Sequence, residues 1–354
     1  MKIYQDTDLW EYLSQTEKTV VMYGMGNGAD KILAICCRYG IEVADFFASD
    51  GFVRGHSFHG KRVLYYSEVK EKYGAESIIV LLSFASSLPE VLALFDRVDG
   101  ECEMYAPDVP VCGDTLFNME FYNSNKARFE EVYEMLEDEE SKAIFENVIN
   151  YKLSGRISYL REAVSSRDGV WELIGDINIA ADLGAYNGDT VKELKAYRPN
   201  VKKVYAVEPD RRNFRKLSDY TETLDTPTVV AVNAAAWSGS ATLSFADSGN
   251  RNSGAFAKGK QVDVTAVALD SLVGEDAVDY IKYDVEGAER EALLGSEETI
   301  KKHSPTLLVS IYHRSEDMFA LPLLVKELDT SYKLYLRRYP YVPAWDLNLI
   351  CKAK

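Results

Sequence analysis

A lysine, several acids and a histidine with the spacing of a proton-transfer site lie in the last third of the sequence. The segment DYIKYDVEGAE is typical of a strand, and its two-residue alternation places Lys282, Asp284 and Glu286 on one side near the strand's end. His313, in SIYHR, follows the next apolar strand. Charged groups at a strand end are costly to bury without partners or a purpose. We therefore expect these four residues to be catalytic.

His313 is the preferred general base, because an unperturbed imidazole titrates near neutral pH. Asp284 would orient the ring or share the proton, and Lys282 would pair with the acids or stabilise a developing alkoxide. A capped strand end is the alternative for His313. Asp284, Glu286 and His313 also suit a divalent ion, but an ion pair with Lys282 explains the acids equally well. We assign no metal ligands.

A second candidate site follows the strand INIAADLGAY. The turn DLGAYNGDT carries two glycines that allow a ligand to approach the backbone, and Glu208 ends the next strand 24 residues after Gly184. A carboxylate at that position accepts hydrogen bonds from both hydroxyls of a ribose. The predicted cofactor-binding residues are Asp182, Gly184, Ala185, Tyr186, Gly188, Asp189, Thr190, Glu208 and, in VNAAAWS, Asn233.

The charge of this turn distinguishes between adenosine-bearing cofactors. Asp182, Asp189, Glu208 and Asp210 outnumber the nearby arginines, which disfavours the pyrophosphate of a dinucleotide. S-adenosylmethionine carries a sulfonium, an ammonium and no phosphate, so it suits an acidic pocket. The alternative is that the glycines serve only a tight turn and Asp182 caps a helix.

Alternating strands and helices position these residues. The pattern predicts an α/β chain: a small Rossmann-like domain over residues 1–113, a helical connector over 114–165 and a larger domain over 166–354. In the larger domain a mostly parallel sheet is expected to end in an antiparallel hairpin formed by YKLYLRRY and LNLICKA. Ligands of such sheets bind beyond the carboxyl ends of the strands.

The glycine turn of the first domain, GMGNGAD, lacks the full dinucleotide fingerprint. A nucleotide-sugar site and a module used for packing or dimerisation stay equally open, so a homodimer is one option. His56 and His59 have no further cysteine or histidine at ligand spacing, which favours loop polarity over a metal site. The polar stretch from Ala246 to Gln261 fits an acceptor-binding loop, with Arg251 and Lys258 meeting an anion, or a solvated loop.

Composition restricts the classes of function. The chain has 354 residues, 47% of them hydrophobic and 27% charged, and a net charge of −16. This sign disfavours nucleic-acid and anionic-membrane partners. The five cysteines show no C-x-x-C pair, and no apolar run reaches the length of a spanning helix. Reduced thiols, no membrane insertion and a cytoplasmic location are expected.

Several motifs together resemble the FkbM family of S-adenosylmethionine-dependent methyltransferases. They occur in family order over about half the chain: DLGAYNGDT, YAVEPDRRNFRKL, VNAAAWS, LDSL, YIKYDVEGAE and LLVSIYHRSEDM. The resemblance implies the class I methyltransferase fold and O-methylation of a hydroxyl on a sugar, glycan intermediate or related small metabolite. It places Asp182 and Gly184 at the methionine side of the cofactor, Glu208 at the ribose and Asn233 near the adenine. Asp284 and Glu286 correspond to the active-site acids.

The chain departs from the family pattern at two positions, and two other functions stay open. Asn187 and Ser310 stand where the family often carries acids, which argues against a fixed metal site. An epimerase or oxidoreductase binding NAD or a nucleotide sugar would need a stronger glycine fingerprint in the first domain and a catalytic Tyr/Lys pair. A non-catalytic cofactor-binding protein is the remaining alternative, because a fold does not establish a function.

Overall fold

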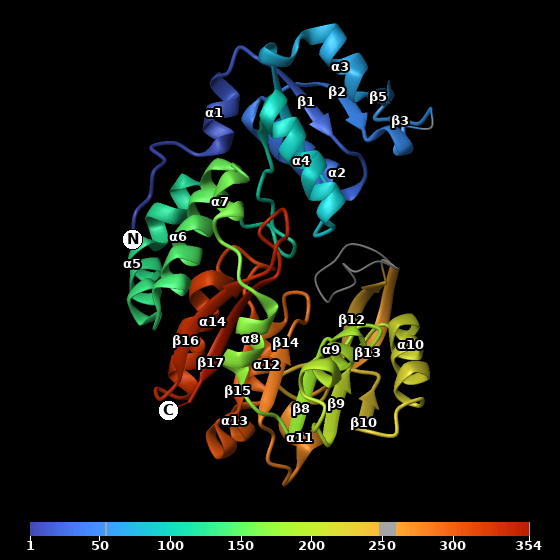
Figure 1. Cartoon of the computed structure of the whole chain (residues 1–354), viewed down its shortest axis with the longest axis vertical. Helices are drawn as coiled ribbons and strands as arrows, with labels where there is room; N and C mark the ends of the chain where they lie inside the picture. Colours follow the sequence, from blue (N-terminus) through green and yellow to red (C-terminus); the bar gives the residue numbers. More distant parts are fainter. Residues whose placement is uncertain (54, 248–259, 354) are drawn as a thin grey trace.

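The computed structural model describes residues 1–53, 55–247 and 260–353. The predicted acceptor-binding residues Arg251 and Lys258 lie outside these ranges. Figure 1 shows a smaller α/β domain joined through a group of helices to a larger one, with both termini on the side of the helices.

The first domain is built on a five-stranded parallel sheet in the order β5-β2-β1-β6-β7. The central strands, TVVMY and IIVLL, are almost entirely buried, as expected for parallel strands covered by helices on both faces. The five strands of this sheet are β1 (Thr19–Tyr23), β2 (Val43–Ala48), β5 (Leu64–Tyr65), β6 (Ile78–Leu82) and β7 (Glu103–Tyr105), and β3 (Ser57–Phe58) and β4 (Lys61–Arg62) form a separate antiparallel pair. The helices of this domain are α1 (Leu9–Gln15), α2 (Asn27–Tyr39), α3 (Tyr66–Tyr73) and α4 (Pro89–Glu101), with 3₁₀ turns at Asp50–Phe52 and Ala75–Ser77. This parallel sheet with its helices agrees with the Rossmann-like first domain that the sequence predicts.

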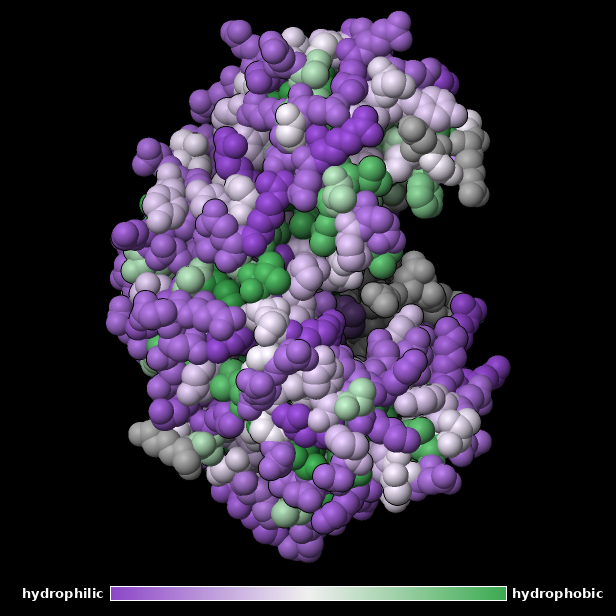
Figure 2. Space-filling model, in the orientation of Figure 1, coloured by the Kyte–Doolittle hydropathy of each residue, from purple (hydrophilic) through white to green (hydrophobic). Residues whose placement is uncertain are grey.

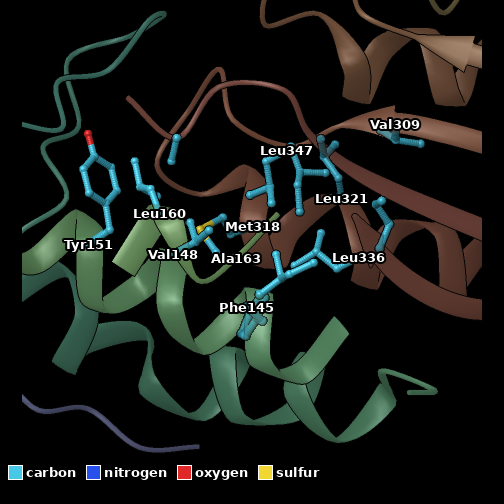
Figure 3. Packing of buried hydrophobic residues seen from close by; sticks show 14 of the residues in the cluster. Phe145, Val148, Tyr151, Leu160, Ala163, Val309, Met318, Leu321, Leu336 and Leu347 are labelled. Atoms are coloured by element: carbon cyan, nitrogen blue, oxygen red, sulfur yellow. The ribbon is translucent and has the colours of Figure 1, made fainter. Parts of the chain in front are cut away.

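Four helices connect the two sheets: α5 (Met119–Met135), α6 (Glu139–Ser154), α7 (Ser158–Arg161) and α8 (Arg167–Ile174). Figure 3 shows Phe145 and Val148 of α6 facing Leu336 and Leu347 of the C-terminal sheet, and these residues belong to one buried cluster. The connector therefore shares its core with the larger domain. Asn118, Asp138 and Ser166 cap three of these helices by accepting backbone N–H bonds.

The larger domain has a seven-stranded sheet in the order β10-β9-β8-β14-β15-β17-β16. All neighbours pair in parallel except β17, which is antiparallel to both β15 and β16, so the predicted terminal hairpin is confirmed. β8 pairs with β9 on one side and β14 on the other, and this reversal of strand order is the switch point where ligands bind. The strands are β8 (Ile179–Leu183), β9 (Lys203–Val207), β10 (Thr228–Val232), β14 (Tyr280–Tyr283), β15 (Thr306–Ser310), β16 (Lys333–Arg338) and β17 (Leu347–Lys352).

A smaller three-stranded sheet, in the order β11-β13-β12, lies beside the main one. Its strands are β11 (Ala235–Ala236), β12 (Ala241–Asp247) and β13 (Lys260–Val267), and the helices of the domain are α9 (Asp189–Tyr197), α10 (Arg211–Thr221), α11 (Leu269–Val273), α12 (Glu289–Leu294), α13 (Glu297–His303) and α14 (Asp317–Leu328). All five cysteines are free thiols. Among the helices of the described residues, none is long and apolar enough to span a membrane.

Candidate active site

A cavity of about 520 Å³ opens at the carboxyl ends of β8, β9, β14 and β15. The predicted residues Gly184, Glu208, Lys282 and His313 all line it, so two separate sequence regions meet in one site. Ser87 and Val111 of the N-terminal region also line the cavity. Figure 2 shows the surface hollowed between the upper and lower parts of the molecule.

The turn after β8 approaches the end of β14 so closely that only glycine fits at its start. Gly184 has φ +89, and a Cβ there would lie 1.8 Å from the carbonyl oxygen of Asp284. Tyr186 continues the turn with φ 45, and Gly188, φ 88, is the N-cap of α9. The turn therefore places backbone from the predicted cofactor motif directly against the predicted catalytic strand.

Glu208, at the end of β9, is buried and held by two backbone donors. Its Oε2 accepts a hydrogen bond of 2.8 Å from the Tyr186 N–H, and its Oε1 accepts one of 2.8 Å from the Asp210 N–H. Burial raises the pKa of Glu208 to about 7, although these two bonds oppose the shift. Each carboxylate oxygen keeps a lone pair for a ligand that donates hydrogen bonds.

The other predicted cofactor residues differ in their position relative to the cavity. Tyr186, Asp189 and Thr190 line the cavity, whereas Ala185 is completely buried beneath the turn. Asn233 is exposed, and its amide donates to the carbonyl oxygens of Glu208 (2.8 Å) and Pro209 (3.1 Å). Asn233 thus supports the loop that carries Glu208, and Ala235 and Ala236 line the cavity instead.

Lys282 joins two carboxylates below the turn. Its Nζ lies 3.4 Å from Asp182 Oδ1 and 3.3 Å from Asp284 Oδ2. Burial opposes the ammonium charge, but Asp284 and Asp182 outweigh burial and raise the pKa of Lys282. Asp182 Oδ2 is buried without a hydrogen-bond partner among the described residues, and burial raises the pKa of Asp182 to about 6. Lys282 thus compensates part of the acidity of the cavity.

His313 is 1% exposed and lies between acids on both sides of its ring. Its Nδ1 is 2.9 Å from Glu289 Oε1, and its Nε2 is 3.6 Å from Glu286 Oε2 and 3.7 Å from Asp284 Oδ1. Burial alone would lower the pKa of His313, but Glu289, then Glu286 and Asp284, outweigh it and raise the pKa to about 10. At neutral pH the ring is therefore a cation that links the buried Glu289 to the two acids at the cavity.

Glu286 and Asp284 have opposite pKa shifts despite their proximity. Burial raises the pKa of Glu286 to about 7, whereas Lys282 and His313 outweigh burial and lower the pKa of Asp284. Asp284 also accepts a hydrogen bond of 3.2 Å from the Tyr312 hydroxyl. Glu286 has φ 52, which turns the chain out of the strand direction. The alternation that placed it beside Lys282 and Asp284 therefore ends before Glu286, because β14 ends at Tyr283.

Sequence reasoning missed Glu289, which is 1% exposed in the first turn of α12. Its Oε1 accepts backbone N–H bonds from Val285 (2.9 Å) and Gly287 (3.4 Å), so it holds the turn as well as the ring of His313. The sequence feature that indicates Glu289 is its place in YDVEGAE, three residues after Glu286 and at the start of a helix.

Asp284, Glu289 and His313 each offer a ligand atom within 4.8 Å of the others. This donor set is chemically suitable for a divalent ion. However, Glu289 faces Nδ1 and Asp284 faces Nε2, so the two acids approach opposite nitrogens of the ring. Lys282 also lies 3.3 Å from Asp284. Ion pairs satisfy this geometry, and we assign no metal to it.

Comparisons with known proteins give a family match for the larger domain and a similar fold for the chain. The family model of the FkbM methyltransferase domain matches residues 182–342, a range that holds the cavity residues named above except Ser87 and Val111. The methyltransferase FkbM from Methylobacillus flagellatus KT is similar in structure with a TM-score of 0.73 at 20% identity, over 97% of this chain and 92% of that chain. An rRNA methylase from Streptococcus thermophilus is 15% identical over 56% of this chain and 96% of that chain, with a TM-score of only 0.36. No curated protein matches the chain.

Proposed function

Because residues 182–342 form a methyltransferase domain of the FkbM family, we propose that this methyltransferase transfers a methyl group from S-adenosylmethionine to a hydroxyl of a sugar, a glycan intermediate or a related small metabolite. The observation that carries the proposal is Glu208, a buried carboxylate fixed by two backbone amides at the switch point of the sheet. An acceptor of two hydroxyl hydrogen bonds at this position suits a ribose.

The charge of the cavity supports this cofactor over a dinucleotide. Asp182, Asp189, Glu208 and Asp284 line it or lie beneath it, and Lys282 is already paired with two of these acids. A site with this balance favours a cationic ligand and opposes a pyrophosphate. Glu208 would hold the ribose, and the Gly184 turn with Asp182 would hold the methionine part.

When bound, S-adenosylmethionine supplies an electrophilic methyl group, so the chain must align the acceptor oxygen with it and remove the hydroxyl proton. His313 was the expected base from the sequence. The three acids that surround the ring keep it protonated at neutral pH, because they raise the pKa of His313 to about 10. Glu286, with a pKa of about 7, is matched to accept a proton near neutral pH.

We therefore assign the proton of the acceptor to Glu286 and give the His313 cation a supporting role. His313 Nε2 lies 3.6 Å from Glu286 Oε2, so its charge stabilises the carboxylate before the transfer. The buried carboxylate of Glu289, 2.9 Å from Nδ1, fixes the ring in this orientation. Glu286 would take the hydroxyl proton of the acceptor while the acceptor oxygen would take the methyl group that the cofactor supplies.

The decisive experiment uses S-adenosylmethionine with a labelled methyl group and a panel of nucleotide sugars and surface-glycan fragments, with mass spectrometry of all products. Label on a sugar hydroxyl supports the proposal, and Glu286→Gln should remove it while calorimetry still shows cofactor binding. Label only on protein or nucleic acid would overturn the acceptor class. Tight NADH binding without S-adenosylmethionine binding would overturn the cofactor.

A further inference from the structure

Residues 106–118, which we call the strap, connect the first sheet to the helices without any regular secondary structure. They follow β7 and precede α5. An irregular segment of this length inside a folded chain must satisfy its backbone polar groups through side chains and loops, and such segments are often functional. In Figure 1 the segment between β7 and α5 descends from the first domain toward the larger one. Its hydrogen bonds show which parts of the molecule it holds.

The beginning of the strap is anchored within the N-terminal part of the chain. Lys152 and Asp108 form a buried ion pair of 2.9 Å, and Lys31 of α2 donates to the carbonyl oxygens of Pro110 (3.0 Å) and Val111 (2.9 Å). Burial lowers the pKa of Lys31, so its ammonium relies on these carbonyls for solvation. The strap is thus fixed just before it reaches the active site.

The middle of the strap contacts both loops that carry the proton-transfer residues. The Cys112 N–H donates to the carbonyl oxygen of His313 (2.9 Å), and the Cys112 thiol donates to the carbonyl oxygen of Glu286 (3.0 Å). Burial raises the pKa of Cys112 to about 12, so the thiol keeps the proton it donates. One residue therefore joins the backbone of the loop after β14 to that of the loop after β15.

Cys112 packs closely against the backbone of Gly287. Gly287 has φ +92, and a Cβ there would lie 2.9 Å from Cys112 Cβ and 3.0 Å from its Sγ. Further along, the Ser315 hydroxyl donates to the carbonyl oxygen of Thr115 (2.7 Å). The strap thus contacts the two loops through Cys112 and Thr115, next to Glu286 with its φ of 52.

We propose that the strap, through Cys112, is the positioning element that sets the distance between Glu286 and His313. The strap touches the backbone of both residues and none of their reacting atoms, so Cys112 is a positioning residue. This role rests on the proposed function, in which that pair removes the acceptor proton. Since misplacement by about 1 Å can cost about 100-fold in rate, loss of the thiol contact should reduce turnover with little effect on cofactor binding.

The test compares Cys112→Ala, which removes the donor, with Cys112→Ser, which keeps one. Cys102→Ala is the matched control, because Cys102 is a buried thiol with a hydrogen-bonding neighbour, Tyr66, whereas Cys112 is half-buried, and Cys102 lies in the first domain. Turnover is measured on the acceptor found with labelled cofactor, and cofactor affinity is measured by calorimetry. We expect Cys112→Ala to lower kcat by about 10- to 100-fold, Cys112→Ser to recover part of it and Cys102→Ala to retain it.

A second measurement needs no acceptor. The chain has four histidines, so the imidazole signals can be followed by NMR through a pH titration and the His313 signal identified by its loss in His313→Gln. Cys112→Ala should shift the titration of His313, and Cys102→Ala should leave it unchanged. An unshifted His313 titration together with full turnover in Cys112→Ala would overturn the role of the strap. Wild-type protein that binds no S-adenosylmethionine would overturn the proposed function, and the His313 titration would still decide the strap.

Discussion

Replacing Glu208 with glutamine tests the cofactor site most directly. The substitution keeps the size of the side chain but leaves one acceptor oxygen where two now receive N–H bonds from Tyr186 and Asp210. The amide group would face one of these donors, and a ribose hydroxyl would lose a charged acceptor. A hydrogen bond to a charged group contributes about 1.5–3 kcal/mol, so S-adenosylmethionine affinity should fall by about 10- to 150-fold.

The same carboxylate should make cofactor binding depend on pH. Burial raises the pKa of Glu208 to about 7, and only the ionised form accepts from both hydroxyls. Cofactor affinity should therefore fall as the pH is lowered from 8 to 6, by at most about tenfold per unit from this group. Asp182, with a pKa raised to about 6, acts in the same direction at lower pH. The slope around pH 7 should disappear in Glu208→Gln.

Calorimetric titration of S-adenosylmethionine at several pH values measures both effects, and thermal unfolding shows whether the variant is folded. Asp276→Asn is the matched control. This carboxylate accepts from Lys203 Nζ (2.7 Å) and the Tyr205 hydroxyl (2.6 Å) at the opposite end of the sheet, so the change should not affect cofactor affinity. A folded Glu208→Gln protein with wild-type affinity and pH dependence would refute the reasoning.

Three further predictions concern the reacting groups and the turn. Turnover should rise with pH with a midpoint near 7, because Glu286 must lose its proton to act as the base. Glu286→Gln should remove this rise and lower kcat by about 100-fold or more. A rise centred near 10 would instead assign the base to His313. Chelation should leave turnover unchanged, and a loss restored by magnesium would contradict the ion-pair interpretation of the acid cluster. Gly184→Ala should lower the free energy of unfolding by about 1–3 kcal/mol for its φ of +89 and by about 1–3 kcal/mol for the contact with Asp284. Chemical unfolding measures this loss. Gly239→Ala is the control and should leave the free energy of unfolding nearly unchanged, because the space around Gly239 is open.

The sequence predicted the fold because its signals are local. Apolar strands such as TVVMY and IIVLL, the glycine turn after β8 and the two final strands each have a pattern visible within ten residues. The carboxyl ends of the parallel strands then bring Glu208, Asp284 and His313 to one edge, and the structure does place them around one cavity. Family order of the motifs strengthened the same conclusion.

What the sequence did not indicate depends on contacts between distant segments. Glu289 was quoted within its motif, but only the fold shows that its carboxylate faces Nδ1 of His313. The charge of the His313 ring follows from three acids gathered by two different loops, so a reference pKa could not predict it. Cys112 stands 174 residues before Glu286, and the residues next to it in the sequence do not indicate this contact.

The first domain lies beside the cavity of the second domain, and this position gives it a role even without a ligand bound to the first domain. The loop after β6 supplies Ser87 and the segment after β7 supplies Val111, so the carboxyl ends of both sheets contribute to one cavity. Two backbone hydrogen bonds between Ser86 and Val342 (2.9 and 3.0 Å) hold the first loop to the hairpin loop that ends the second sheet, which reaches toward the first domain in Figure 1. The glycine turn of the first domain packs closely against Ser83, since a Cβ on Gly28 would lie 2.1 Å from the Ser83 carbonyl oxygen. The first domain can thus form one wall of the cavity through Ser87 and Val111. Under the proposed function, the loops of the first domain would limit which acceptors reach Glu286, while the second domain would hold the cofactor.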